Sequence, residues 1–274
     1  MDTENCTISL ESRRIEIRRM LGTHEKMGSQ MIEIITSMDQ RYYDLIGKDC
    51  VDSFLRHWPS SRGLTVYVEH MVLPVDERIK IIDFDDLEPD YAVFQADPDC
   101  NQSEKKFAKK AYTIMHAMHH SKADWIVWLD ADVISVADMP EQLWTALLDE
   151  QHLSLYMGVN YTSDKSGKKG AWLVPETGVF AVNTRHPDFA TLQDEYCRRY
   201  RERDRSGLRR FYDNDVLGVA IQAVPNATHR DLCAGFLKPY KTPLPHTVLG
   251  KYLIHFKAKH SKAEYGQEPV DEDQ

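Results

Sequence analysis

The sequence predicts an α/β fold with a mostly parallel central sheet flanked by helices, and three observations support this prediction. Strand-like apolar runs alternate with amphipathic, helix-like segments through the first half of the chain. One of these runs, Trp125–Leu129, is almost wholly apolar, as is typical of a central parallel strand covered on both faces. The length of 274 residues suits one domain with a sizeable core.

The elements follow from apolar periodicity and from the turn residues that separate them. In the first half we expect strands over 31–37, 64–69, 79–84 and 125–129, with helices over 42–58 and 107–120. The second half is less regular, with strands over 153–159, 172–182 and 252–256, and helices over 189–205 and 216–224. These elements predict one domain over 31–262, preceded by an arm or helix at 1–30 and followed by a flexible acidic tail at 263–274.

Composition excludes several classes of protein. A net charge of -9 disfavours a broad grip on nucleic acid, which needs a basic surface. The charged N-terminus has no apolar signal-peptide core, and no run approaches the roughly 18 apolar residues of a membrane-spanning helix. The five cysteines have no CxxC spacing, which predicts free thiols of a reducing compartment. We therefore expect a soluble, cytoplasmic chain without a transmembrane segment.

The sequence Asp130-Ala131-Asp132 directly follows the apolar strand 125–129. In sheets of this type, ligands bind outside the carboxyl ends of the strands. Two carboxylates this close raise each other's pKa or require a cation, and a hard divalent cation such as Mn²⁺ or Mg²⁺ satisfies them. The alternative is a turn or helix cap made by the aspartates.

Two blocks of sequence resemble GT-A-fold glycosyltransferases that use nucleotide-sugars. MIEIITSMDQRYYDLIGKDCVDSFLRHWP is similar to their opening strand, nucleotide-binding loop and first helix, and WIVWLDADV is similar to their DxD strand. The resemblance covers about residues 31–262 and is closest to a bacterial and phage-like group. It implies a Rossmann-like GT-A sheet with a nucleotide-binding half at 31–135 and a half for donor sugar and acceptor at 136–262. A phage-encoded member would work in the host cytoplasm.

The resemblance also implies an activity, which is transfer of a sugar from a nucleoside diphosphate sugar, with a UDP-sugar favoured, to a hydroxyl acceptor. Asp130 and Asp132 would hold the Mn²⁺ or Mg²⁺ ion. Contacts to the nucleotide-sugar would come from Thr36, Ser37, Tyr42, Tyr43, Lys106, Lys109 (or its neighbour Lys110), Asp130 and Ala131. A capped loop with core aromatics, and a solvated face of lysines, are the alternative interpretations.

The segment Ile254–His260 resembles the C-terminal part of retaining, glycogenin-like enzymes. There a histidine completes the metal site and a lysine contacts the diphosphate, roles that would fall to His255 and to Lys257 or Lys259. His260 is an alternative ligand, and this chain lacks the Gly and Trp of the HxxGxxKPW pattern.

Two further segments are candidates for catalysis. Glu176 precedes Thr177-Gly178 in what reads as a polar turn, and it suits a sugar-hydroxyl acceptor or a general base. By the resemblance, Asn214 or Asp215 lies beside the anomeric carbon of the donor, although acids there also suit a helix start. The features at His255 and at Asp213-Asn214-Asp215 slightly favour a retaining reaction.

Two other classes remain as alternatives. A nucleotidyltransferase acting on sugar phosphates usually has a Gly-rich loop after the first strand, and Thr36–Arg41 contains no glycine. A non-catalytic sugar- or nucleotide-binding module is the second alternative. The acceptor stays open between a glycan, a lipid-linked sugar, a protein and a modified DNA base, and the basic segment Arg198–Arg210 is a candidate face for an anionic acceptor.

Overall fold

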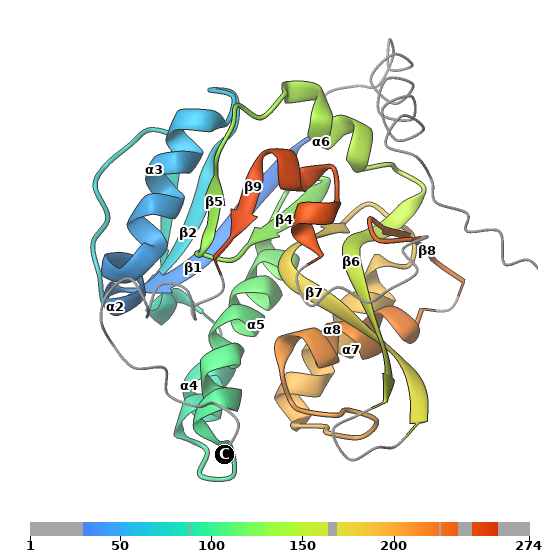
Figure 1. The fold of residues 1–274 in the computed structure, drawn as a ribbon. Coiled ribbons are helices and arrows are strands. Elements are labelled where there is room, and N and C mark those ends of the chain that lie inside the picture. The colour runs from blue at the N-terminus through green and yellow to red at the C-terminus, as the bar shows by residue number, and fades with distance from the viewer. Residues whose placement is uncertain (1–29, 88, 164–168, 225, 235–242, 257–274) are drawn as a thin grey trace, which may run out of the picture.

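A computed structural model describes residues 30–87, 89–163, 169–224, 226–234 and 243–256. Its central sheet has seven strands in the order β3-β2-β1-β4-β7-β6-β8 (Figure 1). The first four strands are mutually parallel, β7 runs antiparallel to β4 and β6, and β8 is parallel to β6. The predicted fold class, a mostly parallel sheet flanked by helices with a less regular second half, is confirmed.

The strands of the large sheet are β1 (Ile32–Asp39), β2 (Leu64–Glu69), β3 (Ile79–Asp83), β4 (Trp125–Leu129), β6 (His152–Ser163), β7 (Lys169–Asn183) and β8 (Thr228–Asp231). A second, two-stranded antiparallel sheet pairs β5 (Val133–Ser135) with β9 (Leu253–His255). All five residues of β4 are buried, as its apolar sequence predicts.

The helices are α2 (Gln40–Tyr42), which continues through a π-helical turn (Tyr43–Gly47) into α3 (Lys48–His57), then α4 (Pro89–Ala96), α5 (Gln102–His120), α6 (Glu141–Leu147), α7 (Phe189–Glu202) and α8 (Asp213–Gln222). Single 3-10 turns span Phe84–Asp86, Leu244–His246 and Leu249–Lys251. Helix α5 begins at a capping box, in which Asn101 accepts from the Glu104 amide and Glu104 accepts from the Asn101 amide.

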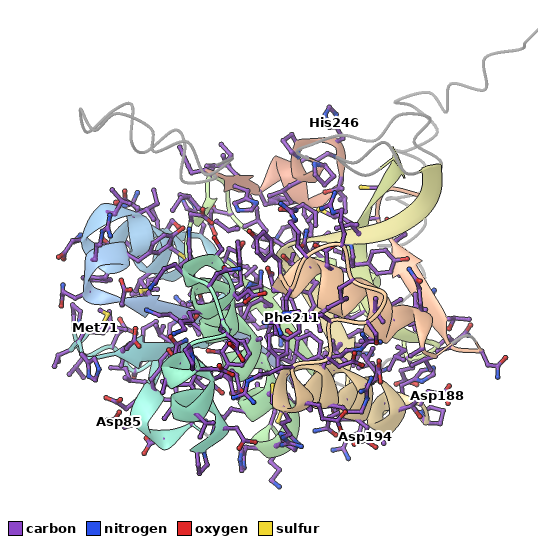
Figure 2. All side chains as sticks on the ribbon, turned by 90° about the horizontal axis from the view of Figure 1, so that it is seen from below. Met71, Asp85, Asp188, Asp194, Phe211 and His246 are labelled. Atoms are coloured by element: carbon purple, nitrogen blue, oxygen red, sulfur yellow. The ribbon has the colours of Figure 1, made fainter. Side chains whose placement is uncertain are left out.

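The helices form two layers around the sheet. Helices α4, α5, α7 and α8 pack on one face, where Phe211 joins their shared core (Figure 2). Helices α3 and α6 pack on the other face, where the rings of Trp58 and Trp144 stack with centroids 5.5 Å apart. This layering covers both faces of the central strands, so polar side chains meet in the loops after β1, β2 and β4, at the carboxyl end of the parallel strands.

The structure corrects several predicted boundaries. Strand β1 continues to Asp39, two residues beyond the predicted end at residue 37, so Thr36 and Ser37 lie well inside it. Thr177 and Gly178 lie within the single strand β7, so the predicted turn is wrong. Helices α4 and α6 and strands β5 and β8 were not predicted, because each is short and has weak periodicity.

Two predictions from composition can be compared with the described residues. Cys50, Cys100, Cys197 and Cys233 are free, buried thiols, as predicted. Within the described ranges, no helix combines the length and the apolar character needed to cross a membrane. The predicted N-terminal arm and acidic tail lie outside the described residues, apart from residue 30.

Candidate metal centre

Three potential metal ligands meet where β4, β5 and β9 adjoin. Asp130 follows the last residue of β4, Asp132 precedes β5, and His255 ends β9. The antiparallel register pairs Val133 with His255, and the Phe256 amide donates to the Asp132 carbonyl at 3.0 Å. The small sheet therefore carries a histidine from late in the chain to the two aspartates.

The donor atoms of these three residues are close enough to share one ion. His255 Nε2 lies 3.1 Å from Asp132 Oδ1 and 3.5 Å from Asp130 Oδ2, and one ligand atom from each residue lies within 4.8 Å of the others. Asp132 is buried, and the oxygen that it turns toward His255 is Oδ1. Two carboxylate oxygens and an imidazole nitrogen suit Mn²⁺, and the carboxylates also suit Mg²⁺.

The two oxygens of Asp130 have different surroundings. Its Oδ1 accepts hydrogen bonds from Trp128 Nε1 and Lys110 Nζ, both at 2.7 Å. The other oxygen, Oδ2, is the one that faces His255. The carboxylate is thus fixed by one oxygen while the second points at the cluster, which is the arrangement expected of an oriented metal ligand.

Lys110 is a buried lysine that connects Asp130 to Asp213. Its Nζ lies 3.0 Å from Asp213 Oδ2 and donates to the Thr177 carbonyl at 2.5 Å. Thr177 also donates its hydroxyl to Asp213 at 2.6 Å. Burial lowers the pKa of Lys110, but the carboxylates of Asp130 and Asp213 outweigh it and raise the pKa above its usual value, so the lysine is charged.

The Thr177 carbonyl can accept from Lys110 because the pairing of β7 with β6 is irregular at this point. The pairing jumps from Leu155↔Ala181 to Met157↔Glu176, so the residues between Glu176 and Ala181 are not paired in sequence with β6. The Thr177 carbonyl consequently accepts from a side chain, Lys110.

Glu176 lies behind His255, on the side away from the aspartates. Its Oε1 is 3.2 Å from His255 Nδ1, and its Oε2 accepts from the Gly178 amide at 3.2 Å. A carboxylate that engages the second ring nitrogen fixes the orientation and tautomer of a metal-binding histidine. Burial lowers the pKa of His255, but the carboxylates of Asp132 and Glu176 raise it to about 10.

Gly178 is the residue that leaves room for the His255 ring. A Cβ at this position would lie 2.5 Å from both Cε1 and Nδ1 of the imidazole, well inside van der Waals contact. The Gly178 carbonyl also accepts from the Asp130 amide at 2.8 Å, which ties β7 to the start of the motif. Any larger residue here would displace the histidine or the strand.

We call these interacting side chains the site network. It consists of Lys110, Asp130, Asp132, Glu176, Asp213 and His255. Four carboxylates face one lysine and one histidine, so two negative charges remain unbalanced even when the histidine is protonated. A divalent cation matches that excess.

The predicted nucleotide contacts are distributed around this edge. The Tyr42 hydroxyl is a hydrogen-bond partner of Asp132, and burial together with the two aspartates raises its pKa far above the usual range. Lys109 Nζ lies 3.2 Å from Asp39 Oδ2 and also binds Glu69. Asp39 and Glu69 are the last residues of β1 and β2, so Lys109 links the carboxyl ends of two neighbouring strands.

The other predicted nucleotide-sugar contacts differ in how far their side chains are buried. Thr36 is fully buried and Ala131 belongs to the core, whereas Ser37 and Tyr43 are half-buried. Lys106 is exposed, with its Nζ 5.8 Å from the centre of the Phe107 ring. The candidates Lys257, Lys259 and His260 lie outside the described residues.

At the start of α8, the acid that enters the site network is Asp213, and not the predicted Asn214 or Asp215. Asp215 is buried, with its carboxylate 3.6 Å from Arg209 and 3.8 Å from Arg210, and Asn214 Oδ1 accepts from the Asp215 amide. Burial raises the pKa of Asp215 above its usual value. Helical geometry separates successive side chains by about 100°, so the sequence could not tell which of the three faces Lys110.

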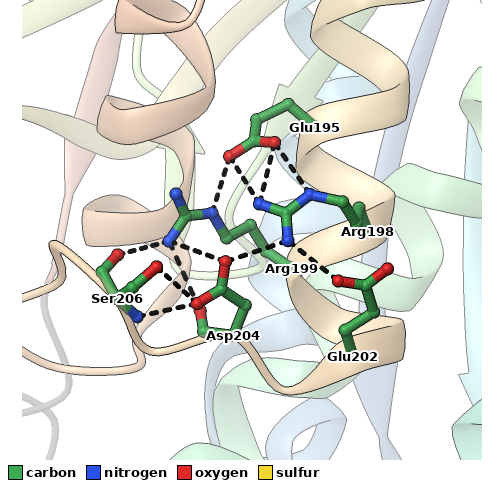
Figure 3. Close-up of polar contacts among 6 residues, drawn as sticks. All are labelled: Glu195, Arg198, Arg199, Glu202, Asp204 and Ser206. Atoms are coloured by element: carbon green, nitrogen blue, oxygen red, sulfur yellow. Dashed lines mark hydrogen bonds and ion pairs between the residues drawn. The ribbon is translucent and has the colours of Figure 1, made fainter.

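Much of the basic segment Arg198–Arg210 is neutralised by neighbouring acids. Arg198 binds Glu195, Glu202 and Asp204, and Arg199 binds Glu195 and Asp204 (Figure 3). The next arginines pair with the first half of the chain, in the contacts Arg201–Asp90, Arg203–Asp97 and Arg205–Glu104. These arginines join α7 to α4 and α5 and do not form a free basic face.

No protein-family model and no curated protein sequence matches this chain. Among solved structures, it is similar to the apo structure of the bifunctional glycosyltransferase WbbM, with a TM-score of 0.46 and 15% sequence identity. That similarity covers 72% of this chain and 38% of the other, so the chain spans well under half the length of that structure.

Proposed function

We propose that this chain is a metal-dependent glycosyltransferase that uses a nucleoside diphosphate sugar, with a UDP-sugar favoured, and a hydroxyl acceptor. The observation that carries the proposal is the cluster of Asp130, Asp132 and His255 at the carboxyl end of the parallel sheet. An oxygen-rich site with an excess of negative charge suits a hard divalent cation and, through it, a diphosphate. The sequence resemblance to GT-A enzymes supports the same class.

In this proposal the residues around the cluster have different roles in binding the ion and the nucleotide. Asp130, Asp132 and His255 hold Mn²⁺ or Mg²⁺, which when bound stabilises the negative charge on the departing nucleoside diphosphate. Lys110 keeps Asp130 oriented and charged through its hydrogen bond to Oδ1. Tyr42 lies in α2, directly after β1, and is a hydrogen-bond partner of Asp132, so it would join the proposed nucleotide-binding loop to the metal ligands.

From the sequence, Glu176 was expected to accept a hydrogen bond from a sugar hydroxyl or to act as a general base, and we propose a different role for it. We assign it as a positioning residue, because its carboxylate is engaged by His255 Nδ1 and by the Gly178 amide. Asp213 is occupied in the same way by Lys110 and Thr177. An inverting reaction needs a carboxylate available to take the proton of the acceptor, so these contacts favour the retaining outcome.

Calorimetric titration of UDP and of GDP, each with and without Mn²⁺, tests the proposal. We expect UDP to bind in the presence of Mn²⁺ and Asp132→Asn to abolish that binding. Asp85→Asn is the matched control, because Asp85 is exposed and follows β3, the edge strand of the large sheet, outside the metal cluster (Figure 2). Release of nucleoside diphosphate from a panel of nucleotide-sugars then identifies the donor.

Two results would contradict the proposal. Failure of both nucleotides to bind under any condition would rule out the donor, and with it the enzyme class. Equal binding with and without Mn²⁺, unchanged by Asp132→Asn, would leave a nucleotide-binding module without a metal-dependent reaction.

A further inference from the structure

A cavity lies at the amino ends of the first three strands, apart from the site network. Its volume is about 590 Å³, and small-molecule sites commonly measure roughly 300 to 1,000 Å³. The first residues of β1, β2 and β3 line it, together with the last turns of α5. The candidate metal centre lies at the carboxyl end of the same parallel sheet, so this cavity has no part in the proposed donor site.

The floor of the cavity is polar, although the same face of the sheet is apolar further along the strands. Ile35 and Tyr67 belong to the core beneath α5. Two residues before them on the same face are Glu33 and Thr65, which line the cavity with Lys80 of β3. Glu33 Oε1 accepts from the Thr65 hydroxyl at 3.0 Å and lies 3.9 Å from Lys80 Nζ. A carboxylate between a sheet and a helix is costly without polar partners, so this floor indicates a hollow for water or a polar ligand.

Two histidines of α5 also line the cavity. The rings of His116 and His120 have centroids 4.3 Å apart, with planes inclined by 39°. The Tyr67 hydroxyl lies 3.0 Å from His116 Nδ1, which fixes the first ring, whereas His120 is exposed. An imidazole has apolar ring faces and nitrogen atoms that donate or accept, and a sugar likewise combines C–H faces with hydroxyl groups. This wall therefore suits a sugar ring.

The charges that line the cavity are nearly balanced. The guanidinium groups of its two arginines are engaged, since Arg62 pairs with Glu141 at 3.0 Å and Arg78 donates to four backbone carbonyls. The remaining carboxylates and ammonium groups of the lining are equal in number, and belong to Glu33, Glu77, Lys80 and Lys122. An ion bound among balanced charges is left uncompensated, whereas an uncharged ligand with many hydroxyls can hydrogen-bond to both signs.

We propose that this cavity binds an uncharged sugar. The carboxylate of Glu33 accepts from the sugar hydroxyls, the ammonium group of Lys122 donates to the sugar oxygens, and the ring of His120 packs against the C–H face. The three residues of the metal cluster do not line the cavity. The inference therefore goes beyond the proposed transfer reaction, because it gives the chain a second and separate place to hold a carbohydrate.

Saturation-transfer NMR on the full chain, in the presence of EDTA, tests the cavity. The neutral probes are glucose, galactose, mannose and N-acetylglucosamine, and the charged probes are glucose 6-phosphate and glucosamine. We expect at least one neutral sugar to bind at least about fivefold more tightly than either charged probe, because an added charge is left uncompensated. Glu33→Gln keeps the shape of the side chain and should weaken that binding by about 5- to 10-fold, since hydrogen bonds to a charged acceptor are the stronger ones. His120→Ala should weaken it as well, and it changes only an exposed side chain.

The matched control is Glu150→Gln, which changes an exposed glutamate outside the lining and should leave sugar binding unaffected. Thermal melting confirms that each variant folds. Absence of binding by every neutral sugar, tighter binding of a charged probe, or insensitivity to both Glu33→Gln and His120→Ala would each overturn the inference. Sugar binding that appears only when Mn²⁺ replaces EDTA would also overturn it, because such binding belongs to the metal centre. Mn²⁺-dependent UDP binding, measured separately, should be unchanged by Glu33→Gln, so the proposed function and the cavity can fail independently.

Discussion

Two networks of charged side chains in this molecule contain similar residues but differ in how much negative charge they leave uncompensated and buried. The first, which we call the α7 network, consists of Glu195, Arg198, Arg199, Glu202, Asp204 and Ser206 (Figure 3). Each of its three carboxylates contacts an arginine, and Ser206 donates to Asp204 from both its amide and its hydroxyl. These bonds and Arg198 hold the pKa of Asp204 well below its usual range. The network stabilises the C-terminal end of α7, and its contacts can be explained without a bound ligand.

The site network has the opposite character. Its carboxylates outnumber its cations by two, and it is largely buried. Burial of unbalanced charge is costly unless a ligand compensates for it. The α7 network also has one carboxylate more than its two arginines, but most of its side chains are partly exposed to water. The comparison teaches that an excess of charge that is buried, more than the number of charged residues, distinguishes a binding site from a structural cluster.

Replacing Lys110 should produce the largest effect. Lys110→Met leaves Asp130 and Asp213 facing each other without their shared cation, which we expect to cost about 3 to 5 kcal/mol of unfolding free energy, as for other broken buried ion pairs. Urea unfolding measures the loss. Lys105→Met, a neighbouring substitution on the same helix, is the control. A Lys110→Met protein as stable as the control would mean that the network is not electrostatically strained.

The next effect concerns Gly178. Gly178→Ala places a methyl group where the His255 ring stands, so Mn²⁺ affinity should fall by more than the roughly 10- to 100-fold typical of outer-shell changes. Titration of Mn²⁺ followed by electron paramagnetic resonance measures it. In a His255→Ala background the same substitution should have no further effect, because the clash is gone. An equal loss in both backgrounds would show that the glycine acts through the strand and not through the histidine.

A smaller effect is expected for Glu176. Glu176→Gln keeps the shape of the side chain but removes the charge opposite His255 Nδ1, so Mn²⁺ affinity should fall by about 10-fold, at the lower end of the outer-shell range. Glu176→Ala should lose more, because nothing then orients the ring. If Glu176 were instead the catalytic base, both variants would bind Mn²⁺ normally and lose only turnover, which a parallel assay of donor hydrolysis detects.

The smallest effect should come from the α7 network. Arg198→Gln removes three partly exposed ion pairs, and such pairs contribute little, so we expect a loss of about 1 kcal/mol or less. Binding of Mn²⁺ and UDP should be unchanged. Urea unfolding and calorimetry together test this, and a change in UDP binding would refute the division between structural and binding networks.

The sequence was sufficient to predict the first half of the sheet and the two aspartates of the candidate metal centre. Strand β4 is apolar on both faces and its end is marked by Asp130, so both could be placed from local pattern. His255 was also predicted as a ligand, but only from the resemblance to a known family. No local signal reveals that the three-residue strand β9 pairs with β5, because a strand this short is defined by its partner and not by its own residues.

Asp213 and Gly178 are two residues whose roles could not be predicted from the local sequence pattern. Three neighbouring polar residues begin α8, and only the packing of α8 against β7 and α5 decides which side chain meets Lys110. Gly178 looked like a turn because glycine often marks one, whereas here it permits a histidine from another sheet to approach the backbone. Tertiary packing overrode propensity in both cases.

The pairing of β9 with β5 has a consequence for the order of events during synthesis. Strands β1 to β4 and both aspartates leave the ribosome well before His255, since roughly 120 residues separate the motif from β9, or about 6 to 24 s at typical rates of translation. A chain interrupted before β9 therefore contains both aspartates but lacks the third potential ligand, so completion of the cluster depends on the last strand that the structure describes.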